Sequence, residues 1–201
     1  MLTAIGDVMR EAYKRGWVTT RDGNISLRRG NKFYITPSGV RKTIIHPEHI
    51  MRGKLTHDGI FAEVDFGDNN VKPSGEFEMH LMLQAAATTC QAVVHLHPTY
   101  TIAAMLKGIE LKKLASMFPE LSRYTRVGDN VNVHPVCSPG LAEETYKKMT
   151  NETGKIMFDV VGQAQHGVTA VAKNPWDAFE HIERLEHICQ IALASGVNFN
   201  D

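Results

Sequence analysis

The segment Val93-Val94-His95-Leu96-His97-Pro98 is the most informative part of this 201-residue chain. Its apolar residues predict a strand over residues 91–97 that ends at Pro98. Side chains two residues apart in a strand point to the same face, so His95 and His97 would lie side by side. Neutral imidazole nitrogens are common zinc ligands, and the pair is therefore a candidate for two ligands of a metal. The alternative is two half-buried histidines on a strand that bind nothing.

A third metal ligand has to come from another part of the chain, because catalytic zinc sites usually combine three protein ligands with one open position. His166 precedes Gly167 between two predicted strands, and this glycine would allow close approach of the backbone to a ligand. His134 precedes Pro135 in a similar strand-to-turn context. The pattern leaves both histidines open as the third ligand.

Glu76 is a candidate acid/base at the start of a helix predicted over residues 75–87. Ser74 as the N-cap and Glu76 as a first-turn acid would account for both residues structurally. A carboxylate beside a metal is also the natural general base for a carbon-bound proton. His80 lies one helical turn after Glu76 and faces the same way, where it would orient the carboxylate or make a core contact.

Two further segments, 22–26 and 36–39, are rich in small polar residues. Each alone is typical of an ordinary turn. Together with the free N–H groups at the start of the 75–87 helix, they would form a phosphate-binding cradle without a cluster of lysines or arginines. The composition agrees, since 22 basic and 22 acidic residues leave no formal net charge. Zero net charge argues against a general nucleic-acid-binding surface and against a polybasic membrane anchor.

Helices and strands alternate along the chain without a repeat or a long linker, which predicts a single α/β domain over residues 1–201. A hairpin-like pair at 25–28 and 33–36 indicates that the sheet is at least partly antiparallel. The other expected strands are 59–66, 131–136, 156–161 and 168–172, and the other expected helices begin at Leu2 and cover 99–106, 142–149 and 174–194. Three widely spaced cysteines and the lack of an apolar run of membrane-spanning length favour a cytoplasmic location.

Five short motifs, taken together, resemble the class II aldolase/adducin family over nearly the whole chain. They are Gly23-Asn24-Ile25-Ser26, Ile35-Thr36-Pro37-Ser38-Gly39, Pro73-Ser74-Gly75-Glu76 with Met79-His80, His95-Leu96-His97, and His166-Gly167. The resemblance implies a three-layer α/β/α sandwich around a largely antiparallel central sheet. It also implies a homotetramer, with active sites between neighbouring subunits.

The resemblance further assigns roles to individual residues. It makes His95, His97 and His166 the ligands of Zn²⁺ or another divalent transition metal, so that His134 is no longer a candidate. It makes Glu76 the acid/base beside the metal. Family aldolases also use a tyrosine near the middle of the chain, for which Tyr124 is the nearest candidate as a second catalytic residue. The residues implied around the substrate phosphate are Asn24, Ser38, Gly39, Ser74 and Gly75.

The implied activity is cleavage of a small ketose phosphate to dihydroxyacetone phosphate and an aldehyde through a zinc-stabilised enediolate. Glu76 favours this activity over the 4-epimerase of the family, which typically has aspartate at that position. A sugar-phosphate dehydratase would share the metal and the glutamate, whereas a non-catalytic adducin-like interaction domain would tend to lose the ligands. Two departures concern the substrate: Gly75 replaces a second serine, and Asp22 puts a negative charge near the expected phosphate.

Overall fold

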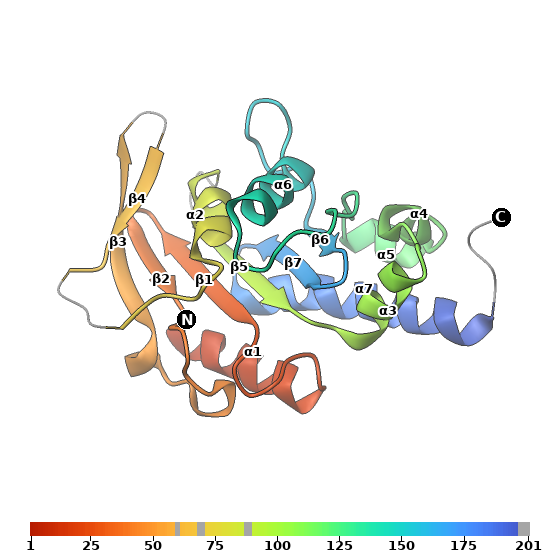
Figure 1. The fold of residues 1–201 in the computed structure, drawn as a ribbon, viewed down its shortest axis with the longest axis horizontal. Helices are drawn as coiled ribbons and strands as arrows, with labels where there is room; N and C mark the ends of the chain where they lie inside the picture. The colour runs from red at the N-terminus through yellow and green to blue at the C-terminus, as the bar shows by residue number, and fades with distance from the viewer. Residues whose placement is uncertain (59–60, 68–70, 87–89, 197–201) are drawn as a thin grey trace.

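An antiparallel sheet runs through the middle of the protein (Figure 1). The computed structural model describes residues 1–58, 61–67, 71–86 and 90–196. In this part of the chain the sheet has seven strands, in the spatial order β4-β3-β2-β1-β5-β7-β6. The strands are β1 Asn24–Arg29, β2 Lys32–Ile35, β3 Met51–Asp58, β4 Phe61–Asp65, β5 Cys90–Leu96, β6 Val160–Gln163 and β7 Gly167–Ala172.

Three neighbouring strands bring distant parts of the sequence to one end of the sheet. Asn24 at the start of β1 pairs with His95 near the end of β5, and His95 pairs in turn with Thr169 near the start of β7. Both pairings are antiparallel, so the starts of β1 and β7 flank the end of β5. Residues just outside these three strand ends therefore meet in space.

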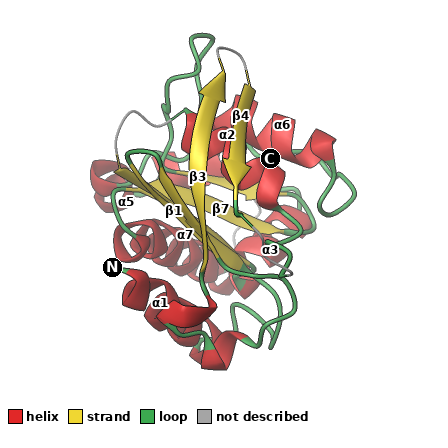
Figure 2. Ribbon diagram, turned by 90° about the vertical axis from the view of Figure 1, so that its left-hand side faces the viewer, coloured by secondary structure: helices red, strands yellow, loops and turns green. Residues whose placement is uncertain are grey.

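Helices cover both faces of the sheet, and this arrangement confirms the expected three-layer sandwich (Figure 2). One face carries α1 Leu2–Lys14 and α7 Pro175–Ser195, and the other carries α2 Phe77–Ala85 and α6 Pro139–Met149. Three shorter helices pack against α7, namely α3 Thr99–Leu106, α4 Leu111–Ser116 and α5 Pro119–Tyr124. The short 3₁₀ helices η1 Lys42–Ile44 and η2 Pro47–His49 contact α1.

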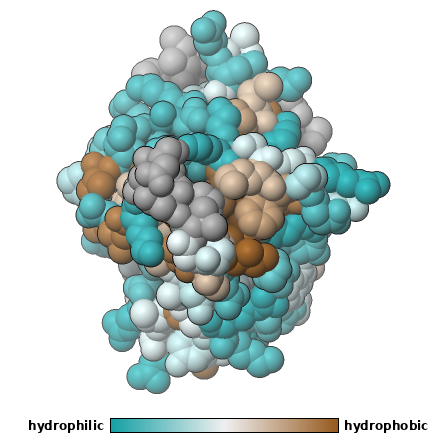
Figure 3. All heavy atoms as spheres, turned by 90° about the vertical axis from the view of Figure 1, so that its right-hand side faces the viewer, coloured by the Kyte–Doolittle hydropathy of each residue, from teal (hydrophilic) through white to brown (hydrophobic). Residues whose placement is uncertain are grey.

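The core lies on both sides of β5. Val94 belongs to the apolar cluster beneath α1 and α7, whereas Val93 belongs to the cluster beneath α2 and α6. A strand buried on both faces is expected to be apolar at successive positions, as β5 is. The outer surface at the α4 end is mostly hydrophilic with small, separate apolar patches (Figure 3). Among the described helices, none is long and apolar enough to cross a membrane.

Several expected elements are wrong or shifted. Residues 131–136 do not form a strand; Val131 makes one bridge to Gln163, and Val133 and Val136 are more than half exposed. The strand expected over 156–161 is instead β6, Val160–Gln163, and the strand expected over 59–66 is β4, with residues 59–60 outside the described part. The elements β3, α4 and α5 have no counterpart among the expected ones.

The start of α2 also differs from the expectation. Its N-cap is Glu76, and the helix begins at Phe77. Ser74 lies two residues before the cap: its hydroxyl accepts a hydrogen bond from the Glu76 N–H at 3.4 Å, and its own N–H donates to the Thr36 carbonyl at 3.2 Å, which holds this segment against the 36–39 loop. By contrast, the expected cap of α7 is confirmed: the Asn174 side chain accepts a hydrogen bond from the Asp177 N–H.

Candidate active site

Three histidine side chains converge at the end of the sheet. His95 lies on β5, His97 follows that strand, and His166 lies in the turn before β7. The Nε2 atoms of His95 and His97 are 2.9 Å apart. One ligand nitrogen from each of the three rings lies within 4.8 Å of the others. The structure therefore brings His95 and His97 together with His166.

His134, the other residue that the sequence pattern left open, lies elsewhere. Its ring nitrogen Nε2 pairs with the carboxylate of Glu144 on α6. The described cluster of possible ligands consists of His95, His97 and His166. His134 is thus wrong as a third ligand, because the segment around residues 131–136 does not continue the sheet toward the other histidines.

Glu76 lies directly beside the histidines. Its Oε2 is 3.2 Å from the Nε2 of His95, and its Oε1 is 3.5 Å from the Nε2 of His166. The side chain is only 6% exposed, and Oε1 is buried without a hydrogen-bond partner. Burial raises the pKa of Glu76 to about 7, although a hydrogen bond from Asn24 opposes the rise. Near neutral pH this carboxyl group can both accept and release a proton.

The three histidines have the protonation state that a divalent metal requires. Burial lowers the pKa of His95 well below its ordinary value, lowers the pKa of His97, and lowers the pKa of His166 to about 4. Metals bind the neutral imidazole, so ligands that stay neutral favour binding. His95 Nδ1 lies 3.1 Å from the Thr169 hydroxyl, which leaves its Nε2 for a metal. With the unpartnered oxygen of Glu76, these side chains fit a divalent transition metal.

Gly167 allows the three rings to approach one another. A Cβ atom at this position would lie 2.6 Å from the carbonyl oxygen of Leu96 and 2.7 Å from the ring of His97. It would also lie 2.9 Å from the ring of His95. Real Cβ contacts are not this short, so no larger residue fits here without displacing the backbone or a histidine ring. The close approach expected at this glycine is thus present, and two of its neighbours are the rings of His95 and His97.

A chain of buried hydrogen bonds orients Glu76. The Asn24 amide donates to Glu76 Oε2 at 3.0 Å, and the Asn24 oxygen accepts from the Nε2 of His80. His80 Nδ1 then accepts from the Ser26 hydroxyl at 2.7 Å. Burial lowers the pKa of His80 to about 3, so the ring is neutral and can donate at one nitrogen while it accepts at the other. His80 therefore reaches Glu76 through Asn24, not by direct contact.

A pocket of 370 Å³ opens beside Glu76. The 36–39 and 72–75 loops form one wall, where the Ser38 N–H donates to the Lys72 carbonyl and Pro37 bridges to Pro73. The pocket brings together Glu76, His97 and His166 with all the residues that were expected around a phosphate: Asn24, Ser38, Gly39, Ser74 and Gly75. Its volume suits a small metabolite.

The comparison with known protein families agrees with this geometry. Residues 3–193 match the family described as "Class II Aldolase and Adducin N-terminal domain". This chain belongs to the class II aldolase and adducin family. The assignment covers every segment that contributes to the pocket and confirms the resemblance found in the sequence motifs.

Relatives within the family carry more than one activity in their names. An L-fuculose phosphate aldolase of Methanocaldococcus jannaschii is 30% identical over 188 residues, which cover 92% of each chain. A 3-oxo-tetronate 4-phosphate decarboxylase of Haemophilus influenzae is 30% identical over 191 residues, covering 90% of this chain and 81% of the other. In structure, a sugar-phosphate aldolase from Thermotoga maritima has a TM-score of 0.74 at 24% identity, covering 98% of this chain and 96% of that one. The family members named here are enzymes.

Cys137 occupies the space beside Gly75, the position at which this chain departs from the family's second serine. A Cβ atom at Gly75 would lie only 2.7 Å from the Cys137 sulfur. Cys137 also lines the pocket. A serine at position 75 would therefore require the thiol to move, so the loss of one hydroxyl goes together with the gain of a thiol.

Two cationic residues of the pocket were not predicted from the sequence. Lys42 and Arg21 both line the pocket, along with Asp22. Lys42 is 2% exposed, whereas Arg21 is exposed. A lysine between Arg41 and Thr43 has nothing in its local pattern that distinguishes it from a surface residue, because its burial depends on the packing of η1 against α1.

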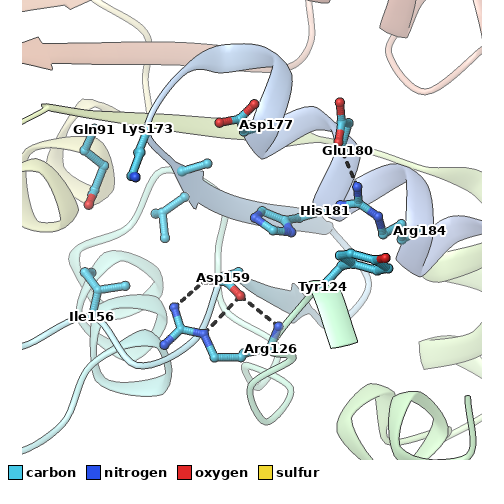
Figure 4. A pocket seen from close by; sticks show the side chains of 12 residues that line it. Gln91, Tyr124, Arg126, Ile156, Asp159, Lys173, Asp177, Glu180, His181 and Arg184 are labelled. Atoms are coloured by element: carbon cyan, nitrogen blue, oxygen red, sulfur yellow. Dashed lines mark hydrogen bonds and ion pairs between the residues drawn. The ribbon is translucent and has the colours of Figure 1, made fainter. Parts of the chain in front are cut away.

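Tyr124 lies outside this pocket. It ends α5 and lines a different pocket of 520 Å³, where Arg126, Asp159 and His181 are among its neighbours (Figure 4). The ring contacts the guanidinium group of Arg184 at 5.6 Å and is about half exposed. Within one chain the structure does not bring Tyr124 to Glu76, so its predicted catalytic role requires a neighbouring subunit.

Proposed function

We propose that this protein is a metal-dependent aldolase that cleaves a small ketose phosphate to dihydroxyacetone phosphate and an aldehyde. One observation carries the proposal: the unpartnered oxygen of Glu76 lies beside the cluster of three histidines, in a pocket lined by serine hydroxyls, glycine N–H groups and two cationic side chains. The match to relatives named L-fuculose phosphate aldolase over 92% of both chains supports it.

Separate sets of residues would bind the metal, transfer the proton and bind the phosphate. His95, His97 and His166 would hold a divalent cation, normally zinc, which when bound acts as a Lewis acid toward the substrate oxygens. Glu76 would move a proton at the adjacent carbon, because its Oε1 is buried beside the histidines without a hydrogen-bond partner. Ser38, Ser74 and the backbone N–H groups around them would hold the phosphate at a fixed distance from Glu76.

In cleavage, a base removes the proton of the hydroxyl group on the carbon that becomes the aldehyde carbon. The carbon–carbon bond then breaks, and its electron pair remains on the dihydroxyacetone phosphate fragment. Glu76, in its protonated form, delivers a proton to that carbon. In the direction of synthesis Glu76 removes the same proton, so one carboxyl group serves both directions. In the expected homotetramer, Tyr124 of a neighbouring subunit would act as the base that takes the hydroxyl proton.

Proton exchange into dihydroxyacetone phosphate tests this proposal without knowledge of the aldehyde. Zinc-loaded protein in D₂O should remove one carbinol proton stereospecifically, as followed by proton NMR, and EDTA should stop the exchange. Glu76→Gln should keep the zinc and the fold but lower the exchange rate at least about a hundredfold, in line with the loss of a general base. Unchanged exchange in this variant would exclude Glu76 as the base.

A decarboxylase of a sugar-acid phosphate is the second candidate, because relatives with that name are 28–30% identical to this chain. Loss of CO₂ from 3-oxo-tetronate 4-phosphate would also leave an electron pair on a three-carbon phosphate, so the same metal and proton donor would serve. Release of CO₂ from that compound would favour this function. Condensation of dihydroxyacetone phosphate with an added aldehyde would favour the aldolase.

A further inference from the structure

Lys42 is a buried cation in the wall of the active-site pocket. Its side chain is 2% exposed, and it lines the pocket together with Ser38, Gly39 and Ser74. The residue belongs to η1, and its backbone N–H donates to the Thr20 carbonyl at 2.8 Å. This bond ties η1 to the loop that leads into Asp22, so the backbone of Lys42 is fixed relative to the pocket.

The ammonium group has no close partner in the described part of the chain. No hydrogen bond or ion pair there joins its Nζ to another side chain, and Nζ is not among the fully buried atoms without a partner, so the end of the side chain keeps a small area open to solvent. Asp22 is near enough for its charge to favour the ammonium, but its carboxylate instead accepts a hydrogen bond from the Thr19 hydroxyl. A buried ammonium without a contacting anion is costly in a folded protein. Such a group is well placed to meet an anion from outside.

The other donors in this part of the pocket are neutral. Ser38 and Ser74 offer hydroxyl groups, and the glycines next to them offer only backbone N–H groups. Gly75 removes one hydroxyl that the family pattern would supply, and Asp22 adds a negative charge. A phosphate dianion in such a pocket would need a positive charge nearby. Lys42 provides that charge from inside the wall, whereas Arg21 is exposed to water.

We propose that Lys42 is a specificity-determining residue, which binds the dianionic end of the substrate and makes the pocket select phosphorylated over unphosphorylated ketones. This inference rests on the proposed function, because it assigns the substrate end that the same pocket recognises. Lys42 thereby compensates for the Asp22 charge and for the missing hydroxyl at position 75.

The test compares dihydroxyacetone phosphate with dihydroxyacetone as substrates for proton exchange in D₂O. Lys42→Met keeps the length of the side chain and removes its charge, and Lys42→Arg keeps a charge. Arg41→Met is the matched control, because it removes one positive charge from the adjacent, exposed position. Zinc content and circular dichroism of each variant show whether the metal site and the fold persist.

Lys42→Met should lower kcat/KM for dihydroxyacetone phosphate by about 10- to 100-fold, mainly through KM, as expected for the loss of a charged contact. Exchange of dihydroxyacetone should fall by a much smaller factor, Lys42→Arg should recover part of the loss, and Arg41→Met should match wild type. An unchanged KM, or an equal loss on both substrates, would overturn the proposal.

A second measurement separates this inference from the proposed function. If the zinc-loaded wild type exchanges neither substrate, the aldolase proposal fails, and Lys42 is then tested by calorimetric titration of inorganic phosphate into zinc-free protein. Weaker phosphate binding in Lys42→Met than in Arg41→Met would still support an anion site at Lys42. Equal binding in the two variants would overturn it.

Discussion

Lys42 and Glu76 are buried ionisable side chains of one pocket, and burial shifts both in the direction that disfavours the charged form. It lowers the pKa of Lys42 to about 8 and raises the pKa of Glu76 to about 7. Each group therefore destabilises the empty protein when it is charged. This cost is common at functional sites, where residues are arranged for a ligand and not for the stability of the free chain.

Lys42→Met should make the zinc-free protein more stable at pH 7, by on the order of 3 kcal/mol for a pKa shift of this size. Since the folded state binds the Lys42 proton less tightly than the unfolded chain, wild-type stability regains this amount as the pH rises from about 8 toward 10.5. The advantage of the variant should therefore shrink in that window. Urea unfolding at pH 7 and pH 10 measures both effects. A less stable variant at pH 7 would mean that the ammonium has a stabilising partner within the protein.

The sequence predicts where a side chain points only when the local sequence pattern defines its face of a strand or helix. His95 and His97 are two apart on an apolar strand, so their shared face follows from the period of the strand. Lys42 has no such signal, because a long cationic side chain in a polar loop is usually solvated. Its burial results from contacts between η1 and α1, which are distant in sequence.

The connection between β1 and α2 determines how Glu76 is oriented. Asn24 and Ser26 point from β1 toward His80 on α2, and Gln84, one turn later, donates to the Ser26 hydroxyl at 2.9 Å. All donors in this chain run in one direction and end at the Glu76 carboxylate. A helix and a strand thus hold the carboxylate between them, and His80 acts as a positioning residue.

His80→Leu should keep zinc but lower kcat for proton exchange about tenfold, as is typical when a supporting hydrogen bond is lost. The apparent pKa of the acid/base in the kcat profile should rise, because the Asn24 hydrogen bond that lowers the Glu76 pKa would loosen. His80→Gln, which can still donate and accept, should recover part of the activity, and the exposed His187→Leu is the control. An unshifted pH profile in His80→Leu would indicate that His80 only fills space.

Elements with a buried stripe or a clear cap could be predicted from the sequence, and others could not. The final helix has both, and its cap at Asn174 is as expected. The false strand over 131–136 has alternating valines, but Val133 and Val136 are exposed and Pro135 has no N–H to donate. Alternation predicts a strand only where a neighbouring strand is available, and that depends on tertiary structure.

The whole molecule holds the site together through the antiparallel order of its middle strands. The proposed ligands lie on β5, just after it and in the turn before β7, the proposed acid/base lies in the segment before α2, and β1 pairs with β5 beside them. A bound metal would link segments that are about 70 residues apart in sequence. Zinc at a hundred times its dissociation constant should therefore raise the free energy of unfolding by about 2.7 kcal/mol, and EDTA should remove this gain.

The central claim is that His95, His97 and His166 hold one catalytic metal beside Glu76. The most direct test is the zinc content per chain of purified wild-type protein, His95→Ala and His134→Ala, by mass spectrometry after equilibration with zinc and gel filtration. We expect about one zinc per chain in wild type and in His134→Ala, and almost none in His95→Ala. Equal zinc in His95→Ala and wild type, or loss of zinc only in His134→Ala, would contradict it.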